Sequence, residues 1–135
     1  MATILLVEDE PDLGLYEAVV LETRGHRVLR CSGGPSPFAA CPMMQRTPCA
    51  IADVADVIVF SCGMFAPVAH RSYRGEHLLR AYRAHPFYGR KPMLVVSLAK
   101  PVGVGGRGPL AFVEKFTQPA AVVEAVDDLL AARSR

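Results

Sequence analysis

Three consecutive carboxylates, Glu8, Asp9 and Glu10, directly follow a short apolar run at residues 4–7. A run of this length that ends at a polar break is typical of a strand buried on both faces. Acidic side chains crowded at the end of such a strand repel one another, and a bound cation relieves that repulsion. Pro11 suits the first turn of a helix, so the acids could instead complement that helix's dipole. The residues alone leave both interpretations open.

Hydroxyl and amine side chains follow other apolar runs of the chain in the same way. In a parallel sheet the carboxyl ends of the strands meet at one edge, and ligands bind there. The acids of such a cluster could bind a divalent cation. We therefore expect five side chains to converge at this edge: Glu8, Asp9, Ser61, Ser97 and Lys115.

Five apolar runs alternate with helical patterns along the chain. The runs lie at residues 4–7, 26–30, 57–60, 93–96 and 110–113, and helices are predicted over 12–24, 76–85 and from 119 onward. Apolar strands alternating with amphipathic helices are typical of a parallel sheet covered on both faces. The fold class is therefore α/β, with a doubly wound sheet of five parallel strands.

The helical patterns also predict which side chains face inward. Leu13, Tyr16 and Val20 recur at helical spacing and predict the inner face of the first helix. On the helix at 76–85, Arg80 and Arg83 are expected to point outward, as part of a basic and solvated surface.

Two segments are rich in helix-breaking residues. Residues 32–55 form an irregular insert with prolines at 35, 37, 42 and 48, and residues 100–109 contain two prolines and four glycines. Such density favours loops over helices. We expect at most a short helix in the first segment and none in the second.

The whole chain of 135 residues fits a single domain, residues 1–135, with 51% hydrophobic and 21% charged residues. No apolar stretch is long enough to span a bilayer and no signal peptide is visible, so a cytoplasmic location is expected. The net charge of +2 does not predict nucleic-acid binding. After Pro119 there is room for one helix, so no effector domain is expected.

The four cysteines (Cys31, Cys41, Cys49 and Cys62) form no Cys-x-x-Cys pair and are expected to be reduced thiols.

The predicted edge resembles that of the receiver domain of two-component response regulators. The segments that carry the resemblance are residues 4–12, 56–61, 75–92, 94–97 and 112–115. It implies a flavodoxin-like sheet of order 2-1-3-4-5. In receivers an acid pair binds a divalent cation, an aspartate after the third strand accepts a phosphoryl group, and a hydroxyl and a lysine contact that group. The matching residues here are Glu8 and Asp9, Ser97, Lys115, and Phe112 as the switch aromatic.

The phosphoacceptor is the position that departs from the family pattern. Ser61 stands there, and no Asp or Glu lies between Asp56 and Glu76. The resemblance is therefore to a pseudo-receiver whose phosphorylation site is degenerate. Loss of this carboxylate weakens magnesium binding, so no metal cofactor is expected, with Glu8 and Asp9 as weak candidate ligands. Lys115 is expected to neutralise Asp9 or Glu8.

Other departures affect the helices and one peptide bond. The second receiver helix is eroded by the insert, and the fourth is short or missing at 100–109, which alters the usual dimer and output face. Phe116 replaces the proline that usually follows the lysine, so this peptide is expected to be trans.

Three functions follow from these residues. The first is an atypical response regulator in bacterial signalling that contacts a kinase, regulator or effector without aspartate phosphorylation, and that could assemble as a homodimer. The second is a receiver-like sensor that binds a small molecule at the strand edge, with residues 100–109 closing over it. The third, an enzyme using Ser61 or Ser97 with Lys115, is not expected because no residue supplies an activated nucleophile.

Overall fold

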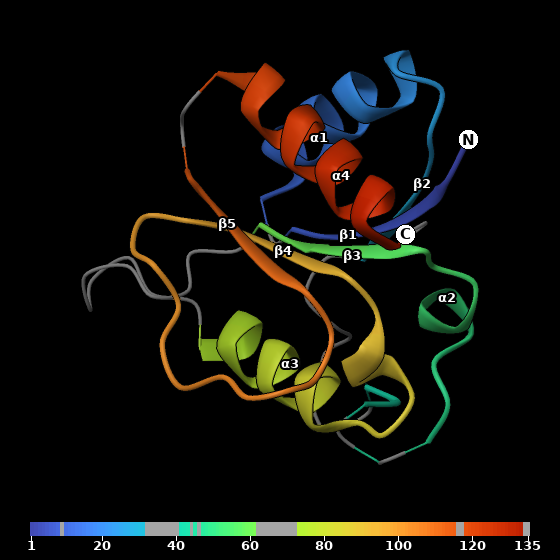
Figure 1. The fold of residues 1–135 in the computed structure, drawn as a ribbon, viewed down its shortest axis with the longest axis vertical. Helices are drawn as coiled ribbons and strands as arrows, with labels where there is room; N and C mark the ends of the chain where they lie inside the picture. The colour runs from blue at the N-terminus through green and yellow to red at the C-terminus, as the bar shows by residue number, and fades with distance from the viewer. Residues whose placement is uncertain are drawn as a thin grey trace.

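The fold is a five-stranded parallel sheet with helices on both faces (Figure 1). The computed structural model describes residues 1–8, 10–31, 41–43, 45, 47–61, 73–115 and 118–133, with only the backbone at Pro11, Tyr73 and Arg74. The strands are β1 (Thr3–Val7), β2 (Arg27–Cys31), β3 (Val57–Phe60), β4 (Met93–Ser97) and β5 (Leu110–Glu114). The helices are α1 (Pro11–Thr23), α2 (Ala50–Asp53), α3 (Tyr73–Ala84) and α4 (Pro119–Arg133), with a 3₁₀ turn at Tyr88–Arg90.

The strand order β2-β1-β3-β4-β5 confirms the predicted topology. Every neighbouring pair is parallel, with Val7 opposite Phe60 and Ser97 opposite Glu114. Backbone hydrogen bonds extend these ladders one residue past the strands, from the Ser61 N–H to the Val7 carbonyl. The register thus places the residues that follow β1 and β3 side by side, at one edge of the sheet.

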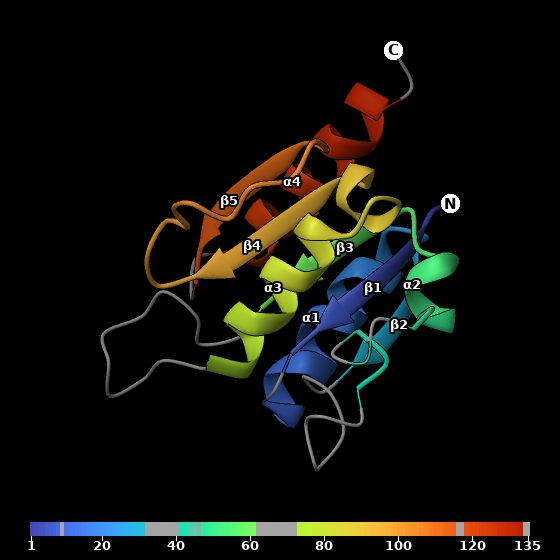
Figure 2. The ribbon, with the colours of Figure 1, turned by 90° about the horizontal axis from the view of Figure 1, so that it is seen from below.

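The helices form two layers around the sheet (Figures 1 and 2): α1 and α4 cover one face, and α2 and α3 cover the other. Each face has its own core. The first includes Ile4, Leu6, Val59, Val96, Ala18, Leu21, Val123 and Val126. The second includes Leu5, Val7, Phe60, Val95, Leu78, Leu79 and Tyr82. Strands β1, β3 and β4 contribute to both cores, which explains their continuous apolar sequences.

The inner face of α1 differs from the predicted one. Tyr16 is 53% exposed, and its neighbours Leu15 and Val19 are 56% and 50% exposed. The buried positions are Gly14, Glu17, Ala18 and Leu21. This helix carries apolar residues on almost every side, so hydrophobic spacing alone does not select the face that packs against the sheet.

The described residues of the insert contain one regular element, the four-residue helix α2, in agreement with the short helix expected there. Lys91 holds the end of this helix, because its Nζ donates to the carbonyls of Ala52, Asp53 and Ala55 at 2.8, 3.0 and 2.7 Å. A cation at this place also complements the helix dipole.

Residues 98–109, all of which the structure describes, contain no helix, as predicted. Arginines of α3 hold this loop instead. Arg83 donates from Nε to the Gly105 carbonyl at 2.7 Å and from Nη1 to the Gly108 carbonyl at 2.9 Å. Arg80 donates to the Gly103 carbonyl at 2.7 Å. The predicted outward orientation of Arg83 is therefore wrong: its side chain is only 6% exposed, and it binds carbonyls that no helix satisfies.

Glycine at position 106 is required by this contact. Gly106 has φ +88°, and a Cβ at this position would lie 2.4 Å from the Arg83 Nε. Both the left-handed backbone and the close approach of the guanidinium favour glycine. The loop and α3 thus form one packed unit.

None of the helices among the described residues has the length and apolar character needed to cross a membrane.

Replacing Arg83 with methionine tests this unit. Arg83→Met keeps the apolar stem but leaves the Gly105 and Gly108 carbonyls without their donors. We expect the free energy of unfolding to fall by about 2 kcal/mol, measured by urea denaturation. The matched change Arg80→Met, at an exposed position with one carbonyl partner, should cost less than about 0.5 kcal/mol. Equal losses for the two variants would contradict the buried role of Arg83.

Candidate functional site

Glu8 is the first buried acid of the site. It follows β1, and its side chain is only 2% exposed. Its Oε1 accepts the Glu10 N–H at 3.0 Å, and its Oε2 lies 3.3 Å from the Nζ of Lys115. Gly14 of α1 permits this placement, because a Cβ there would lie 3.2 Å from the Glu8 Cγ. The absence of a side chain at Gly14 lets helix and acid pack closely.

Lys115 supplies the positive charge next to Glu8. Its Nζ donates to the Ser61 carbonyl at 3.0 Å as well as pairing with Glu8, and its side chain is 8% exposed. The backbone N–H of Lys115 donates to the Ser97 carbonyl, which fixes the residue at the end of β5. The prediction that Lys115 neutralises an acid of the pair is confirmed for Glu8. Asp9 lies outside the described residues.

Ser61, which the resemblance to receiver domains sets at the place of their phosphoacceptor, is fully buried. Its hydroxyl donates a hydrogen bond of 2.6 Å to the Oε2 of Glu17. The hydroxyl therefore points toward α1, and its proton is held by a carboxyl oxygen of Glu17. Glu8, Ser61 and Lys115 come together as predicted, and a fourth residue joins them.

Glu17, which the sequence analysis did not select, is this fourth residue. It lies in the middle of α1 and is 8% exposed. The sequence has no acid directly after β3, but Glu17 supplies an acidic residue to the site from a helix. The ambiguous apolar pattern of α1 concealed it, because a helix without a clear inner face does not indicate which polar side chain is buried. The sequence did contain one indication that Glu17 is buried. Gly14, Ala18 and Leu21 are small or apolar and lie on the same face of α1 as Glu17.

Burial makes Glu17 hard to ionise. Loss of solvent, followed by the neighbouring Glu8 carboxyl, raises the pKa of Glu17 from 4.5 to about 8, against the opposing effects of Ser61 and Lys115. The Oε1 of Glu17 accepts no hydrogen bond from the described residues. When Glu17 is protonated it gains an O–H that can be donated to Glu8. The neutral form therefore suits this site better than the anion.

Ser97 and Phe112 lie apart from this network. Ser97 is buried at the end of β4, and its hydroxyl donates to the Ala99 carbonyl within its own loop. Phe112 is partly buried and packs on the α3 side of the sheet. The sequence placed Ser97 at the correct edge, but its side chain makes no described hydrogen bond to Lys115 or Ser61. Phe112 lies in the middle of β5, opposite Val95. Phe116 and its preceding peptide lie outside the described residues.

The described residues do not fit a divalent metal. Magnesium needs several oxygen ligands in octahedral geometry. Lys115 already bonds to both the Glu8 carboxylate and the Ser61 carbonyl, two oxygens that such an ion would use. Within the described ranges no three His, Cys, Asp or Glu side chains are grouped to hold a metal ion.

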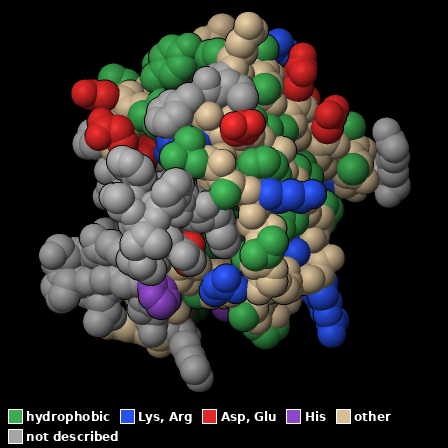
Figure 3. Space-filling view, turned by 90° about the vertical axis from the view of Figure 1, so that its left-hand side faces the viewer, with side chains coloured by type: hydrophobic (Ala, Val, Ile, Leu, Met, Phe, Trp, Pro, Cys, Tyr) green, Lys and Arg blue, Asp and Glu red, His purple; other side chains and the backbone are tan. Residues whose placement is uncertain are grey.

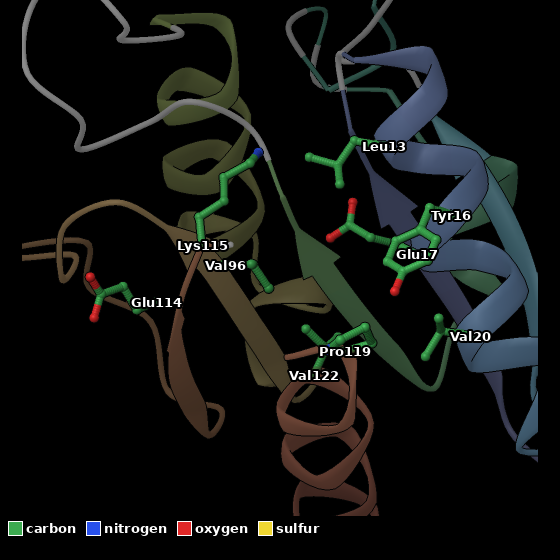
Figure 4. A pocket seen from close by; sticks show the side chains of 9 residues that line it. All are labelled: Leu13, Tyr16, Glu17, Val20, Val96, Glu114, Lys115, Pro119 and Val122. Carbon is green, nitrogen blue, oxygen red and sulfur yellow. The ribbon is translucent and has the colours of Figure 1, made fainter. Parts of the chain in front are cut away.

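A cavity of about 210 Å³ adjoins Glu17 and Lys115 on the α1–α4 side of the sheet (Figure 4). Its walls come from α1, from the ends of β4 and β5, and from the start of α4. Figure 3 looks onto the end of the molecule where the strands finish, and its described surface carries acidic, basic and hydrophobic side chains together. The described part of this surface therefore presents no field of a single sign.

Solved structures of receiver domains resemble this chain over almost its entire length. A receiver domain of a histidine kinase from Syntrophus aciditrophicus has a TM-score of 0.69 at 18% identity, covering 100% of this chain and 94% of that one. A response regulator from Chloroflexus aurantiacus has a TM-score of 0.66 at 19% identity, covering 96% and 98%. The receiver domain of a Pseudomonas aeruginosa sensor histidine kinase, which has magnesium in its active-site cleft, has a TM-score of 0.62 at 20% identity, covering 96% and 98%. The chain thus has the receiver fold.

Sequence comparisons give no corresponding match. No model of a protein family matches the sequence, and no curated protein matches it.

Glutamine at position 17 tests the titration of this buried carboxyl. Between pH 4.5 and about 8 the native state retains a proton that the unfolded chain releases. The contribution of Glu17 to stability is therefore complete below pH 4.5 and is lost as pH rises toward 8, by about 1.4 kcal/mol per unit. Glu17→Gln mimics the protonated acid, so its stability relative to wild type should rise with pH in urea denaturation. Glu114→Gln, at an exposed position, controls for the loss of one carboxylate from the chain, and a pH-independent difference for Glu17→Gln would contradict the assignment.

Proposed function

We propose that this chain acts in two-component signal transduction as a pseudo-receiver, which signals through protein contacts without aspartate phosphorylation. The receiver fold supports the general role. The observation that carries the finer proposal is the state of Ser61: this residue replaces the acceptor aspartate, is fully buried, and donates its hydroxyl to Glu17. Transfer from a phosphohistidine to aspartate gives an acyl phosphate, which a serine hydroxyl cannot form.

The contacts of Lys115 support the same proposal. In receivers the corresponding lysine contacts the phosphoryl group, whereas here the ammonium bonds to Glu8 and to the Ser61 carbonyl. A phosphoryl group on this edge would have to break a buried ion pair, which is costly once one partner loses its counter-charge. In this proposal Lys115 serves as the internal cation of the site, and the chain needs no magnesium.

Helix α1 offers a surface for protein contacts. Leu15, Tyr16 and Val19 are each at least half exposed and lie within little more than one helical turn. Contiguous exposed apolar side chains are typical of protein interaction sites. We propose a cytoplasmic signalling protein, such as a kinase, regulator or effector, as the partner, and the interaction requires no phosphoryl group.

Treatment with acetyl phosphate and magnesium tests phosphorylation independence. We expect the intact mass of the wild-type chain to stay unchanged, because the site lacks an acceptor carboxylate that could form an acyl phosphate. Intact-mass spectrometry before and after hydroxylamine, which cleaves acyl phosphates, provides the measurement.

Two controls define the result. A receiver domain that retains its aspartate, treated in parallel, should gain one phosphoryl group and lose it in hydroxylamine. Ser61→Ala reports whether any adduct requires Ser61. A hydroxylamine-sensitive phosphoryl group on the wild-type chain would refute the pseudo-receiver assignment.

A further inference from the structure

A second cavity, of about 410 Å³, lies beside the last turn of α3. The rest of its wall comes from the turn at residues 85–90 and from the loop that precedes β5, which runs alongside α3 in Figure 1. These segments come just before β4 and β5, whereas Glu8, Ser61 and Lys115 follow their strands. Because all five strands are parallel, this cavity lies at the opposite end of the sheet from the site described above.

The lining of this cavity is basic. Arg83, Arg90 and Arg107 line it together with His85, and no Asp or Glu is among its lining residues. Arg90 and Arg107 are exposed to solvent. None of the three arginines forms an ion pair with another described residue. Three guanidinium charges therefore meet at one cavity without a counter-charge in its walls.

The acids next to this cavity have other partners. Arg90 also lines a neighbouring cavity that contains Asp53 and Asp56. Asp53 accepts the Tyr88 hydroxyl, and Asp56 accepts from the Nη1 of Arg133 at 2.9 Å. These acids are therefore held away from the arginines of the basic cavity.

Arg83 is the buried cation of this group. Its Nε and Nη1 donate to the carbonyls of Gly105 and Gly108, which are neutral acceptors, and loss of solvent lowers its pKa. Its Nη2 has no hydrogen bond among the described residues, and a Cβ at Gly106 would lie only 2.9 Å from it. This nitrogen is not sealed in the core, since Glu17 Oε1 is the one fully buried side-chain polar atom without a partner in the described part of the chain. Glycine at position 106 thus leaves a donor of a charged group uncovered.

Hydrogen bonds fix the walls around these cations. The Nδ1 of His85 accepts the N–H groups of Phe87 and Tyr88, each at 3.1 Å, and the Tyr88 ring stacks on the imidazole. A nitrogen that accepts in this way carries no proton, so the neutral ring has its N–H donor at Nε2. The Arg107 N–H donates to the Gly89 carbonyl at 3.3 Å, which ties the loop to the turn. The basic residues are therefore carried by segments that are bonded to one another.

We propose that this cavity binds a small organic phosphate, with the phosphate group on the Arg83 guanidinium and between Arg90 and Arg107. Guanidinium donors match the oxygens of a phosphate, and three of them without an acid favour a doubly charged group over a carboxylate. The negative end of the α3 dipole faces the cavity, but this effect is weaker than charge-assisted hydrogen bonds. The volume of about 410 Å³ lies within the roughly 300–1,000 Å³ of small-molecule sites, which leaves room for an organic group beyond the phosphate.

Glucose 6-phosphate and glucuronate form a pair of probes for this site. Both carry a hexose ring, but at about pH 7.5 the phosphate has close to two negative charges and the carboxylate has one. Titration of the ¹⁵N-labelled full chain at constant ionic strength, followed by amide chemical shifts, should give saturable shifts at residues 83–90 and 105–108 with glucose 6-phosphate. Glucuronate should bind at least about fivefold more weakly. Tighter binding of inorganic phosphate than of the ester would overturn the organic ligand.

Three isosteric variants separate the cavity from general attraction of anions. Arg90→Gln and Arg107→Gln, both at exposed positions, should each weaken binding of glucose 6-phosphate by about fivefold. Arg27→Gln removes the same charge from an exposed position of β2 outside the cavity and should change binding less than about twofold. Equal effects of the cavity and control variants, shifts that do not saturate, or shifts centred on Glu8 and Lys115 would each overturn the proposal. These outcomes do not depend on phosphotransfer, so the pseudo-receiver role stands or falls separately.

Discussion

The ammonium of Lys115 joins the ends of three strands: it extends from the end of β5, pairs with Glu8 after β1, and donates to the Ser61 carbonyl after β3. Moving such charges out of water is costly, and the arrangement is stable only when the buried groups also have hydrogen-bond partners. Backbone ladders and the N–H of Glu10 provide several of these partners. The geometry of the sheet edge therefore depends on one positive charge held among oxygen acceptors.

Helix α1 is packed around this interaction. Gly14 lets the helix approach the Glu8 side chain, and one turn later Glu17 reaches the Ser61 hydroxyl. The helix thus contributes both the space for one acid and a second buried acid. Because Glu17 is most stable as a neutral carboxyl, the site contains a group whose charge state is set by its surroundings. The neutral Glu17 carboxyl distinguishes this edge of the sheet from a site that contains only the Glu8–Lys115 ion pair.

The sheet was predictable from the sequence, because β1, β3 and β4 are buried on both faces and read as uninterrupted apolar runs. The same apolar runs also predicted where the strands end. The sequence therefore correctly predicted that Glu8, Ser61 and Lys115 lie close together. Side chains that reach the site from a helix were not predictable in this way. Glu17 lies on a helix whose apolar residues surround it, and Arg83 lies on a helix rich in basic residues. Both are buried because of atoms supplied by distant segments, the Ser61 hydroxyl and the loop carbonyls, which local periodicity does not encode.

The two ends of the Glu8–Lys115 pair are separated by 107 residues. During synthesis, Glu8 and Glu17 leave the ribosome well before Lys115, so these two acids have no access to its ammonium until β5 is made. Contacts of such long range form late, since the intervening chain must first lose its conformational freedom. Until β5 docks, the acids are stable only in water or as neutral carboxyls, which opposes premature closure of the sheet edge. Completion of this edge therefore couples β1 and α1 to β5, the strand of the sheet that is synthesised last.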